Sequence, residues 1–303
     1  MKHSIWVERY RPKTISEVIF QDVRQRTSFE NFVTNVDIPH LLLSGIQGTG
    51  KTTISKALIN DLGIDRSDVL RINCSDEKID SMRNKVSSFA ITMPLGKFKV
   101  VQLEELDYSS LESFALLRGL IEDSSASCRF IATCNYSNRI IPPLKSRFQE
   151  FYFRAPDKEK IAERMLHILD TEKIDYDDSD LLAYIDVGYP DIRKTIQLLQ
   201  GNINENKLLP PSQISGTDAD WKFGLLDSIT SGDFKTARRL VCESATREEH
   251  VDIFTFLYTN IEKMKVKDKD AAVITIAEFA RNHSLVSDTE LNLAAMFLSL
   301  GKL

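Results

Sequence analysis

The chain has 303 residues, of which 42% are apolar, and a formal net charge of −5 at pH 7. This length predicts two or three domains, each with an apolar core of its own. The negative charge excludes a surface that attracts nucleic acid over its whole extent, so a nucleic-acid partner would need a locally basic face.

Cysteines, histidines and apolar runs indicate the compartment. The four cysteines lie far apart without a CxxC pair, which favours buried free thiols under reducing conditions. The five histidines show no metal-ligand spacing, so zinc is not expected. Because we find neither a signal peptide nor an apolar run long enough to span a membrane, we expect a cytoplasmic protein without a membrane partner, in the host cytoplasm if the source is a virus.

The chain begins with an aromatic and basic segment, followed by one predicted helix. Residues 6–12 read WVERYRP, and on their own they are compatible with a simple docking arm. Apolar residues recur at helical spacing over 22–35, and Pro39 ends that pattern.

A phosphate-binding loop follows. A short apolar run predicts a strand over 41–43, and GIQGTGKT (45–52) matches the pattern Gly-x-x-x-x-Gly-Lys-Thr. The glycines let the backbone fold around a phosphate, and the N-terminus of the helix predicted over 52–62 adds partial positive charge. In this pattern Lys51 reaches the β- and γ-phosphates and the Thr52 hydroxyl ligates Mg²⁺. The other residues expected around the nucleoside triphosphate are Gly45, Gln47, Gly48, Thr49, Gly50 and Thr53.

Two further strand ends carry polar side chains. The apolar run 100–103 ends in Glu104 and Glu105, and strand-end acids that face a phosphate loop hold magnesium and orient the attacking water. The first such acid is usually Asp, so Glu104 departs from the pattern as a metal ligand, whereas Glu105 keeps the place of the water-polarising base. The strand predicted over 128–135 ends in Asn135, whose amide suits the γ-phosphate or the lytic water.

Strands are also predicted over 69–73 and 150–153, and helices over 75–91 and 109–122, the latter opened by a capping box of Ser109 and Glu112. The alternation of strands and helices predicts a parallel α/β sheet whose ligands bind at the carboxyl ends of its strands.

Past Pro156 the strand pattern stops. Three short helices, over 157–173, 178–186 and 190–200, predict a small all-α domain with Arg193 in the first turn of the third helix. A polar, proline-containing linker over 202–220 precedes about five more helices, in which acidic and basic residues nearly balance. The predicted domains are 1–154, 155–205 and 206–303.

Together these motifs resemble the AAA+ ATPases, and among them the sliding-clamp loaders of DNA polymerases. The resemblance is close for the small subunits of replication factor C and closest for the clamp-loader large subunit of T-even-like tailed phages. It covers nearly the whole chain. It implies an AAA+ phosphate-loop domain with a parallel sheet, then a small all-α lid and an all-α C-terminal collar through which copies assemble.

The resemblance also implies roles at the nucleotide. WVERYRP is similar to the family's WVEKYRP, which implies an adenine pocket with Val7, Tyr10, Arg11 and Ile19. ATCN is similar to the family's sensor 1 and implies that role for Asn135.

Two arginines and one lysine take their roles from the same resemblance. SRF resembles the family's Ser-Arg-Cys motif, with Phe148 in place of Cys, and implies that Arg147 is an arginine finger for ATP on a neighbouring subunit. YPDIRKTI implies that Arg193 contacts the γ-phosphate, and SDEKID implies that Lys78 links DNA binding to the catalytic acid.

The implied activity is DNA-stimulated ATP hydrolysis with ATP and Mg²⁺ as cofactors. ATP binding would close a spiral of copies, with one different subunit, that opens the sliding clamp and grips primer–template DNA; hydrolysis would release the clamp. DNA contacts through Lys78 and Arg83 would reach phosphates and read no sequence. The apolar residues of 91–95 are expected either to touch the clamp or to belong to the core.

Three alternatives stay open. A protein-remodelling AAA+ ATPase would carry an aromatic pore loop after the second strand, where none is found. A scaffold subunit that binds ATP with weak or no hydrolysis is kept open by Glu104, although the other motif residues are present. An origin initiator or helicase loader is disfavoured because no DNA-binding module follows the lid.

Overall fold

The computed structural model describes residues 5–211 and 220–303, which form two compact units with their boundary between Lys160 and Ile161. None of the described helices is long and apolar enough to cross a membrane.

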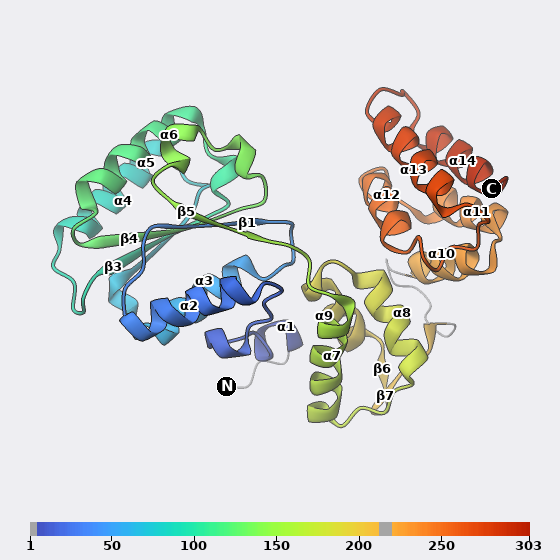
Figure 1. Cartoon of the computed structure of the whole chain (residues 1–303), viewed down its shortest axis with the longest axis horizontal. Coiled ribbons are helices and arrows are strands. Elements are labelled where there is room, and N and C mark those ends of the chain that lie inside the picture. Colours follow the sequence, from blue (N-terminus) through green and yellow to red (C-terminus); the bar gives the residue numbers. More distant parts are fainter. Residues whose placement is uncertain (1–4, 212–219) are drawn as a thin grey trace. The chain divides into compact units, whose positions relative to one another are not determined.

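A five-stranded parallel sheet is the centre of the first unit (Figure 1). Its strands are β1 (Leu41–Gly45), β2 (Val69–Asn73), β3 (Lys99–Glu104), β4 (Cys128–Cys134) and β5 (Gln149–Phe153). Their order in space is β2-β3-β4-β1-β5, and every neighbouring pair is parallel. The predicted parallel α/β sheet is therefore confirmed. Because β4 lies between β1 and β3, the segments that follow these three strands emerge side by side at the carboxyl edge.

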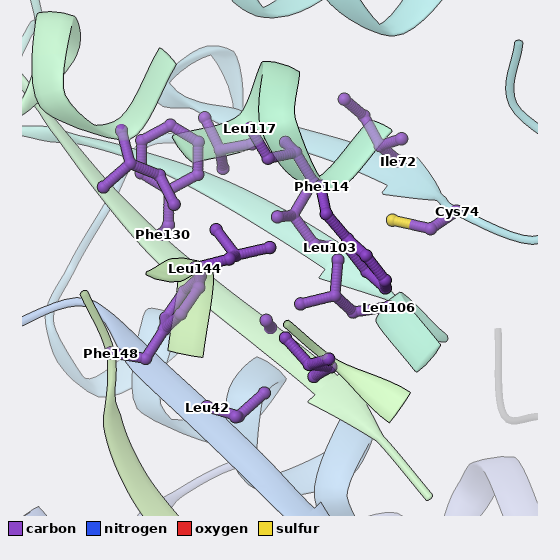
Figure 2. Packing of buried hydrophobic residues seen from close by; sticks show 14 of the residues in the cluster. Leu42, Ile72, Cys74, Leu103, Leu106, Phe114, Leu117, Phe130, Leu144 and Phe148 are labelled. Atoms are coloured by element: carbon purple, nitrogen blue, oxygen red, sulfur yellow. The ribbon is translucent and has the colours of Figure 1, made fainter. Parts of the chain in front are cut away.

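Helices cover both faces of this sheet (Figure 1). One face packs on α2 (Val23–Asn35) and α3 (Lys51–Asp61), and the other on α4 (Ile79–Ile91), α5 (Leu111–Ser124) and α6 (Pro142–Lys145). Successive strand residues point to opposite faces, so Leu41 and Leu43 enter the first core while Leu42 enters the second. Figure 2 shows the second core, in which Phe114 and Leu117 of α5 lie over Leu103 and Phe130. Each such fully buried side chain stabilises the fold by about 1.5–3 kcal/mol.

Short helices occupy several connections: α1 (Trp6–Arg9), η1 (Ile15–Glu17), η2 (Arg66–Asp68), η3 (Leu106–Tyr108) and η4 (Ser137–Arg139). The turn η3 changes one predicted helix start. Ser109 closes η3, and α5 begins after Ser110, whose Oγ accepts a hydrogen bond from the N–H of Ser113 at 3.2 Å. The predicted capping box of Ser109 and Glu112 is therefore wrong. Similarly, the helix predicted over 75–91 begins only at Ile79.

The second unit consists almost entirely of helices. They are α7 (Lys158–Glu172, which begins just before the boundary), α8 (Asp178–Gly188), α9 (Ile192–Gly201), α10 (Asp220–Ser231), α11 (Phe234–Ser244), α12 (His250–Thr259), α13 (Lys269–His283) and α14 (Thr289–Leu300). Part of the predicted linker forms a hairpin of β6 (Ile203–Asn204) and β7 (Lys207–Leu208), and residues 212–219 of that linker lie outside the described residues. The division of this region into lid and collar stays a prediction.

All four cysteines are free thiols, and three of them, Cys74, Cys128 and Cys134, are buried. Burial raises the pKa of Cys74 and of Cys134 to about 12, so both thiols stay protonated at neutral pH. The prediction of buried free thiols is confirmed for these three, while Cys242 is half-buried.

Candidate nucleotide-binding site

The loop between β1 and α3 has a backbone that depends on glycine. Gly45, Gly48 and Gly50 have φ angles of 145°, 78° and 86°, which glycine adopts without strain. At Gly45 an added Cβ would lie 2.1 Å from the carbonyl oxygen of Phe153, so β5 also leaves no room for a side chain there. Gly50 is the N-cap of α3 and brings no side chain to the N–H groups of its first turn, which leaves them able to bind an anion.

Lys51 is the charged group at the centre of this loop. Its residue is 8% exposed, and its Nζ donates to the carbonyl oxygens of Gly45 and Ile46, at 2.8 and 2.7 Å, and to Oδ1 of Asn135 at 2.9 Å. These three oxygens are neutral, so they orient the ammonium without cancelling its charge. The buried lysine and the glycine turns together fit the phosphates of a nucleoside triphosphate.

Asn135 immediately follows β4 and is held by a residue that the sequence did not point to. Oδ2 of Asp107, in η3, accepts hydrogen bonds from the N–H groups of Asn135 and Tyr136, at 3.1 and 3.0 Å. Asp107 is only 5% exposed. The one available signal was its place two residues after Glu105, and that spacing gives no hint of a partner on another strand.

The two strand-end acids differ in their surroundings. Glu104 is the last residue of β3, is half-buried and pairs with Asn73 in the β2–β3 ladder. Glu105 is exposed and has a φ of 56°, a left-handed conformation that costs a non-glycine residue about 1–2 kcal/mol. Its N–H donates to Oγ1 of Thr133 on β4 across a long 3.4 Å. The turn therefore moves Glu105 out of the ladder at the edge where Lys51 and Asn135 lie.

The other predicted residues of the phosphate loop surround Lys51 in sequence. Thr49 is buried, and its hydroxyl donates to the carbonyl oxygen of Ile46 at 2.9 Å, which closes the loop. Thr52 and Thr53, in the first turn of α3, are half-buried, and Gln47 is exposed at the tip of the loop.

The predicted adenine-pocket residues are all half-buried, in and after α1. The ring of Tyr10 lies edge-on to that of the buried Trp6, with centroids 6.2 Å apart. Arg11 forms an ion pair with Glu8 at 2.5 Å. Contact of Val7, Tyr10, Arg11 or Ile19 with adenine stays a prediction.

Arg147 lies at the opposite edge of the sheet from Lys51. It precedes β5 by two residues, and the N–H of Gln149 donates to the carbonyl oxygen of His40, just before β1. Five strand residues, or about 16 Å, therefore separate it from the phosphate loop. Its Nε donates to Oε1 of Glu122 on α5 at 2.8 Å, its Nη2 contacts the same oxygen, and its Nη1 donates to the carbonyl oxygen of Pro143 at 2.9 Å.

The remaining predicted residues lie on helix starts. Lys78 is the exposed N-cap of α4, and Arg83 is exposed one turn later. Arg193 is exposed in the first turn of α9 in the second unit, where Asp191 caps the helix by accepting from its N–H at 2.8 Å. Three residues near the end of α4, Ile91, Met93 and Leu95, are 83%, 87% and 76% exposed, so the expectation that they belong to the core is wrong.

A phosphate loop, a strand-end amide and strand-end acids on a five-stranded parallel sheet define a phosphate-loop ATPase. Residues 41–155 match the family described as ATPase family associated with various cellular activities (AAA). The fold is similar to that of solved structures of Thermotoga maritima RuvB, one with a TM-score of 0.58 at 17% identity, covering 94% of this chain and 91% of that one.

Relatives with higher sequence identity show which family of AAA ATPases the chain belongs to. The replication factor C small subunit of Archaeoglobus fulgidus is 38% identical over 87% of this chain and 86% of its own length. That of Picrophilus torridus is 35% identical over 91% of this chain and 90% of its own length. The chain belongs to the replication factor C small-subunit family and is an AAA+ ATPase subunit of a clamp loader. The predicted fold class and function are thereby confirmed, while the expected closeness to phage clamp loaders stays a prediction.

Proposed function

We propose that this ATPase works through composite sites, in which ATP held by the Lys51 loop of one copy is completed by Arg147 of the next copy. The observation that carries this proposal is the position of the two groups at opposite edges of one sheet. Lys51 and Asn135 meet at the carboxyl edge, 2.9 Å apart, whereas Arg147 precedes β5 at the amino edge. An arginine so placed has no route to the ATP of its own chain.

Within one site, each side chain has a separate task. Lys51 binds the β- and γ-phosphates, Asn135 orients the γ-phosphate or the attacking water, and Glu105 accepts the proton of that water. Thr52 and Glu104 hold Mg²⁺, which neutralises charge on the phosphates when it is bound. Glu104 is half-buried at the end of β3, beside the turn that carries Glu105, so its longer side chain fits a ligand of magnesium or of magnesium-bound water.

The remaining nucleotide contacts come from the beginning of the first domain and from α9 of the lid. Val7, Tyr10, Arg11 and Ile19 surround adenine, and Arg193 of the lid reaches the γ-phosphate. The lid comprises 155–205, and the collar (206–303) holds neighbouring copies and one different subunit together.

Two surfaces of the first unit face the other partners. The exposed Lys78 and Arg83 contact phosphates of primer–template DNA, which gives binding that weakens with salt and does not depend on sequence. The exposed apolar side chains of Ile91, Met93 and Leu95 contact the sliding clamp, because a group of exposed apolar side chains is typical of a protein–protein contact.

Steady-state ATP hydrolysis tests the composite site. The rate per subunit should rise with protein concentration and rise further when primer–template DNA, clamp and partner subunit are added. Arg147→Ala and Glu105→Gln should each abolish the stimulated rate while a fluorescent ATP analogue still binds. A rate that is independent of concentration and unchanged in Arg147→Ala would contradict the proposal.

The second candidate is a subunit that binds ATP for assembly and hydrolyses it weakly. The presence of Glu104 in place of Asp favours it, because the extra methylene shifts the carboxylate relative to the metal. ATP-dependent assembly without hydrolysis in any mixture would support this second candidate.

A further inference from the structure

Asp107 joins the two strand ends that carry Glu105 and Asn135. We propose that Asp107 is a positioning residue for ATP hydrolysis, which fixes the main chain of Asn135 and couples it to the turn of Glu105. This inference rests on the roles proposed above for Asn135 and Glu105. It adds a residue that touches neither nucleotide nor water.

The first observation is where the ladder between β3 and β4 stops. Its last pair is Leu103 with Ala132, and β4 continues beyond it only against β1, as far as the pair of Ser44 and Cys134. The N–H groups of Asn135 and Tyr136 thus follow the end of the strand, and both donate to one oxygen of Asp107. Because these N–H groups lie past the last ladder pair of β4 and take the buried Asp107 carboxylate as their acceptor, this carboxylate determines where Asn135 leaves the sheet.

The second observation is that the turn of Glu105 is hydrogen-bonded to residues before and after the end of β4. The N–H of Glu105 donates to Oγ1 of Thr133, and the side chain of Asp107 accepts from the N–H of Asn135. Three consecutive residues of the turn thereby span the end of β4. When the amide of Asn135 leaves Lys51 and binds a phosphate instead, Asn135 shifts. The hydrogen bonds of the turn transmit this shift to Glu105.

The third observation is the burial of the Asp107 carboxylate. The residue is 5% exposed, and among the described residues its Oδ1 is a buried oxygen without a hydrogen-bond partner. Among the described residues, the hydrogen bonds of this side chain are therefore made by Oδ2, to the two N–H groups after β4. An asparagine in its place keeps an oxygen for these N–H groups, whereas an alanine leaves both without an acceptor.

Kinetics of four variants test the role: Asp107→Ala, Asp107→Asn, Asn135→Ala and the double variant Asp107→Ala/Asn135→Ala. With the full chain assembled on DNA and clamp, Asp107→Ala should lower kcat about tenfold or more, as misplacement by an ångström does, and leave the dissociation constant of fluorescent ADP within about twofold. Asp107→Asn should lose less. The double variant should be no slower than Asn135→Ala, because both substitutions disable the same group.

Amide hydrogen exchange gives a readout that does not depend on catalysis. Exchange at Asn135 and Tyr136 should be faster in Asp107→Ala and close to wild type in Asp107→Asn. The matched control is Asp65→Ala, which also removes two hydrogen bonds to one carboxylate oxygen, from the N–H and Oγ of Ser67 before β2, and should change neither kcat nor exchange at Asn135.

The outcomes separate this inference from the proposed function. A slow Asn135→Ala beside a normal Asp107→Ala, losses that add in the double variant, or unchanged exchange at Asn135 would each overturn the role of Asp107 alone. A normal rate in Asn135→Ala would overturn the proposed role of Asn135 and with it this inference.

Discussion

The ammonium nitrogen of Lys51 and the side-chain oxygen of Asn135 are 2.9 Å apart. Lys51 belongs to α3, directly after the phosphate loop, and Asn135 follows β4, the neighbour of β1 in the sheet. A γ-phosphate carries more negative charge than an amide oxygen, so we expect a nucleotide bound at this loop to compete for the ammonium and release the Asn135 side chain. The proposed role of Asn135 therefore includes its release from Lys51 when a nucleotide binds.

Asn135→Ala should consequently slow hydrolysis more than it weakens binding. Loss of one positioned polar group at a charge-developing site costs about 10²–10³ in kcat, while most of the binding contacts come from the loop and from Lys51. Single-turnover hydrolysis and the dissociation constant of a fluorescent ATP analogue measure the two effects separately. A weakened affinity with an unchanged single-turnover rate at saturating ATP would show that Asn135 acts in binding alone.

Gly45→Ala should destabilise the first unit, because the new Cβ would lie 2.1 Å from the carbonyl oxygen of Phe153 and the φ of 145° is strained for alanine. Overpacking of this kind costs about 1–3 kcal/mol or more. The matched control is Gly119→Ala in α5, where no atom lies within 4 Å of the added methyl group and helix propensity predicts a gain of about 0.5–1 kcal/mol. Urea midpoints should move in opposite directions; a shift in the same direction would contradict the argument.

The sheet was predictable because β1, β3 and β4 are largely apolar runs of ordinary length. The bounds of β2 are those expected from the sequence, and β1 and β3 differ only at their ends. Helix starts were less predictable. Before α4, the side chains of Ser75 and Asp76 bond to Asn73 at 3.0 and 2.8 Å, and such local bonds compete with the helix and delay it to Ile79.

The candidate site likewise contains some residues that the sequence indicates and others that only the structure reveals. Lys51, Glu105 and Asn135 carry motifs or strand-end positions, so the sequence points to them directly. Asp107 becomes informative only once β3 and β4 are known to be neighbours, because its two hydrogen bonds cross between strands. The partner of Arg147, Glu122, lies 25 residues away in sequence on another helix, a relationship that no spacing rule contains.

Arg147→Ala should remove ATP hydrolysis from the assembly without loss of fold stability. The ion pair with Glu122 is partly exposed, with side chains 32% and 51% accessible, and such pairs contribute about 0–1 kcal/mol. Loss of a finger costs about 10³–10⁵ in rate. The decisive measurement mixes Arg147→Ala copies with Lys51→Ala copies, each inactive alone. Partial recovery of ATPase activity shows a finger that acts on its neighbour, and its absence would contradict the composite site; Glu122→Gln serves as the control for stability.

Glu104→Gln should raise the Mg²⁺ concentration needed for half-maximal hydrolysis. The amide keeps the size of the side chain and removes the negative charge that a hard cation prefers. Glu104→Asp, which restores the shorter carboxylate common in this position, should keep the wild-type Mg²⁺ dependence more closely than Glu104→Gln does. ATPase rates titrated with Mg²⁺ at fixed ATP distinguish the two, and identical curves for wild type and Glu104→Gln would exclude Glu104 as a ligand.

His40 should make the first unit less stable in mild acid. Its Nδ1 accepts a hydrogen bond from the N–H of Phe130 at 3.1 Å, and burial, followed by the nearby Arg129 guanidinium, lowers the pKa of His40 below its usual 6.5. The unfolded chain therefore takes up a proton that the folded chain resists. The stabilisation is fully present above pH 6.5 and declines as the pH falls from 6.5 toward the lowered folded pKa.

His40→Asn should flatten that decline, because the amide oxygen can take the place of Nδ1 as acceptor and does not titrate. The decline should shrink and not vanish, since burial also lowers the pKa of His283. Urea unfolding measured at several pH values between about 5 and 7.5 gives the slope. An equal slope in wild type and His40→Asn would show that His40 titrates alike in the folded and unfolded chain.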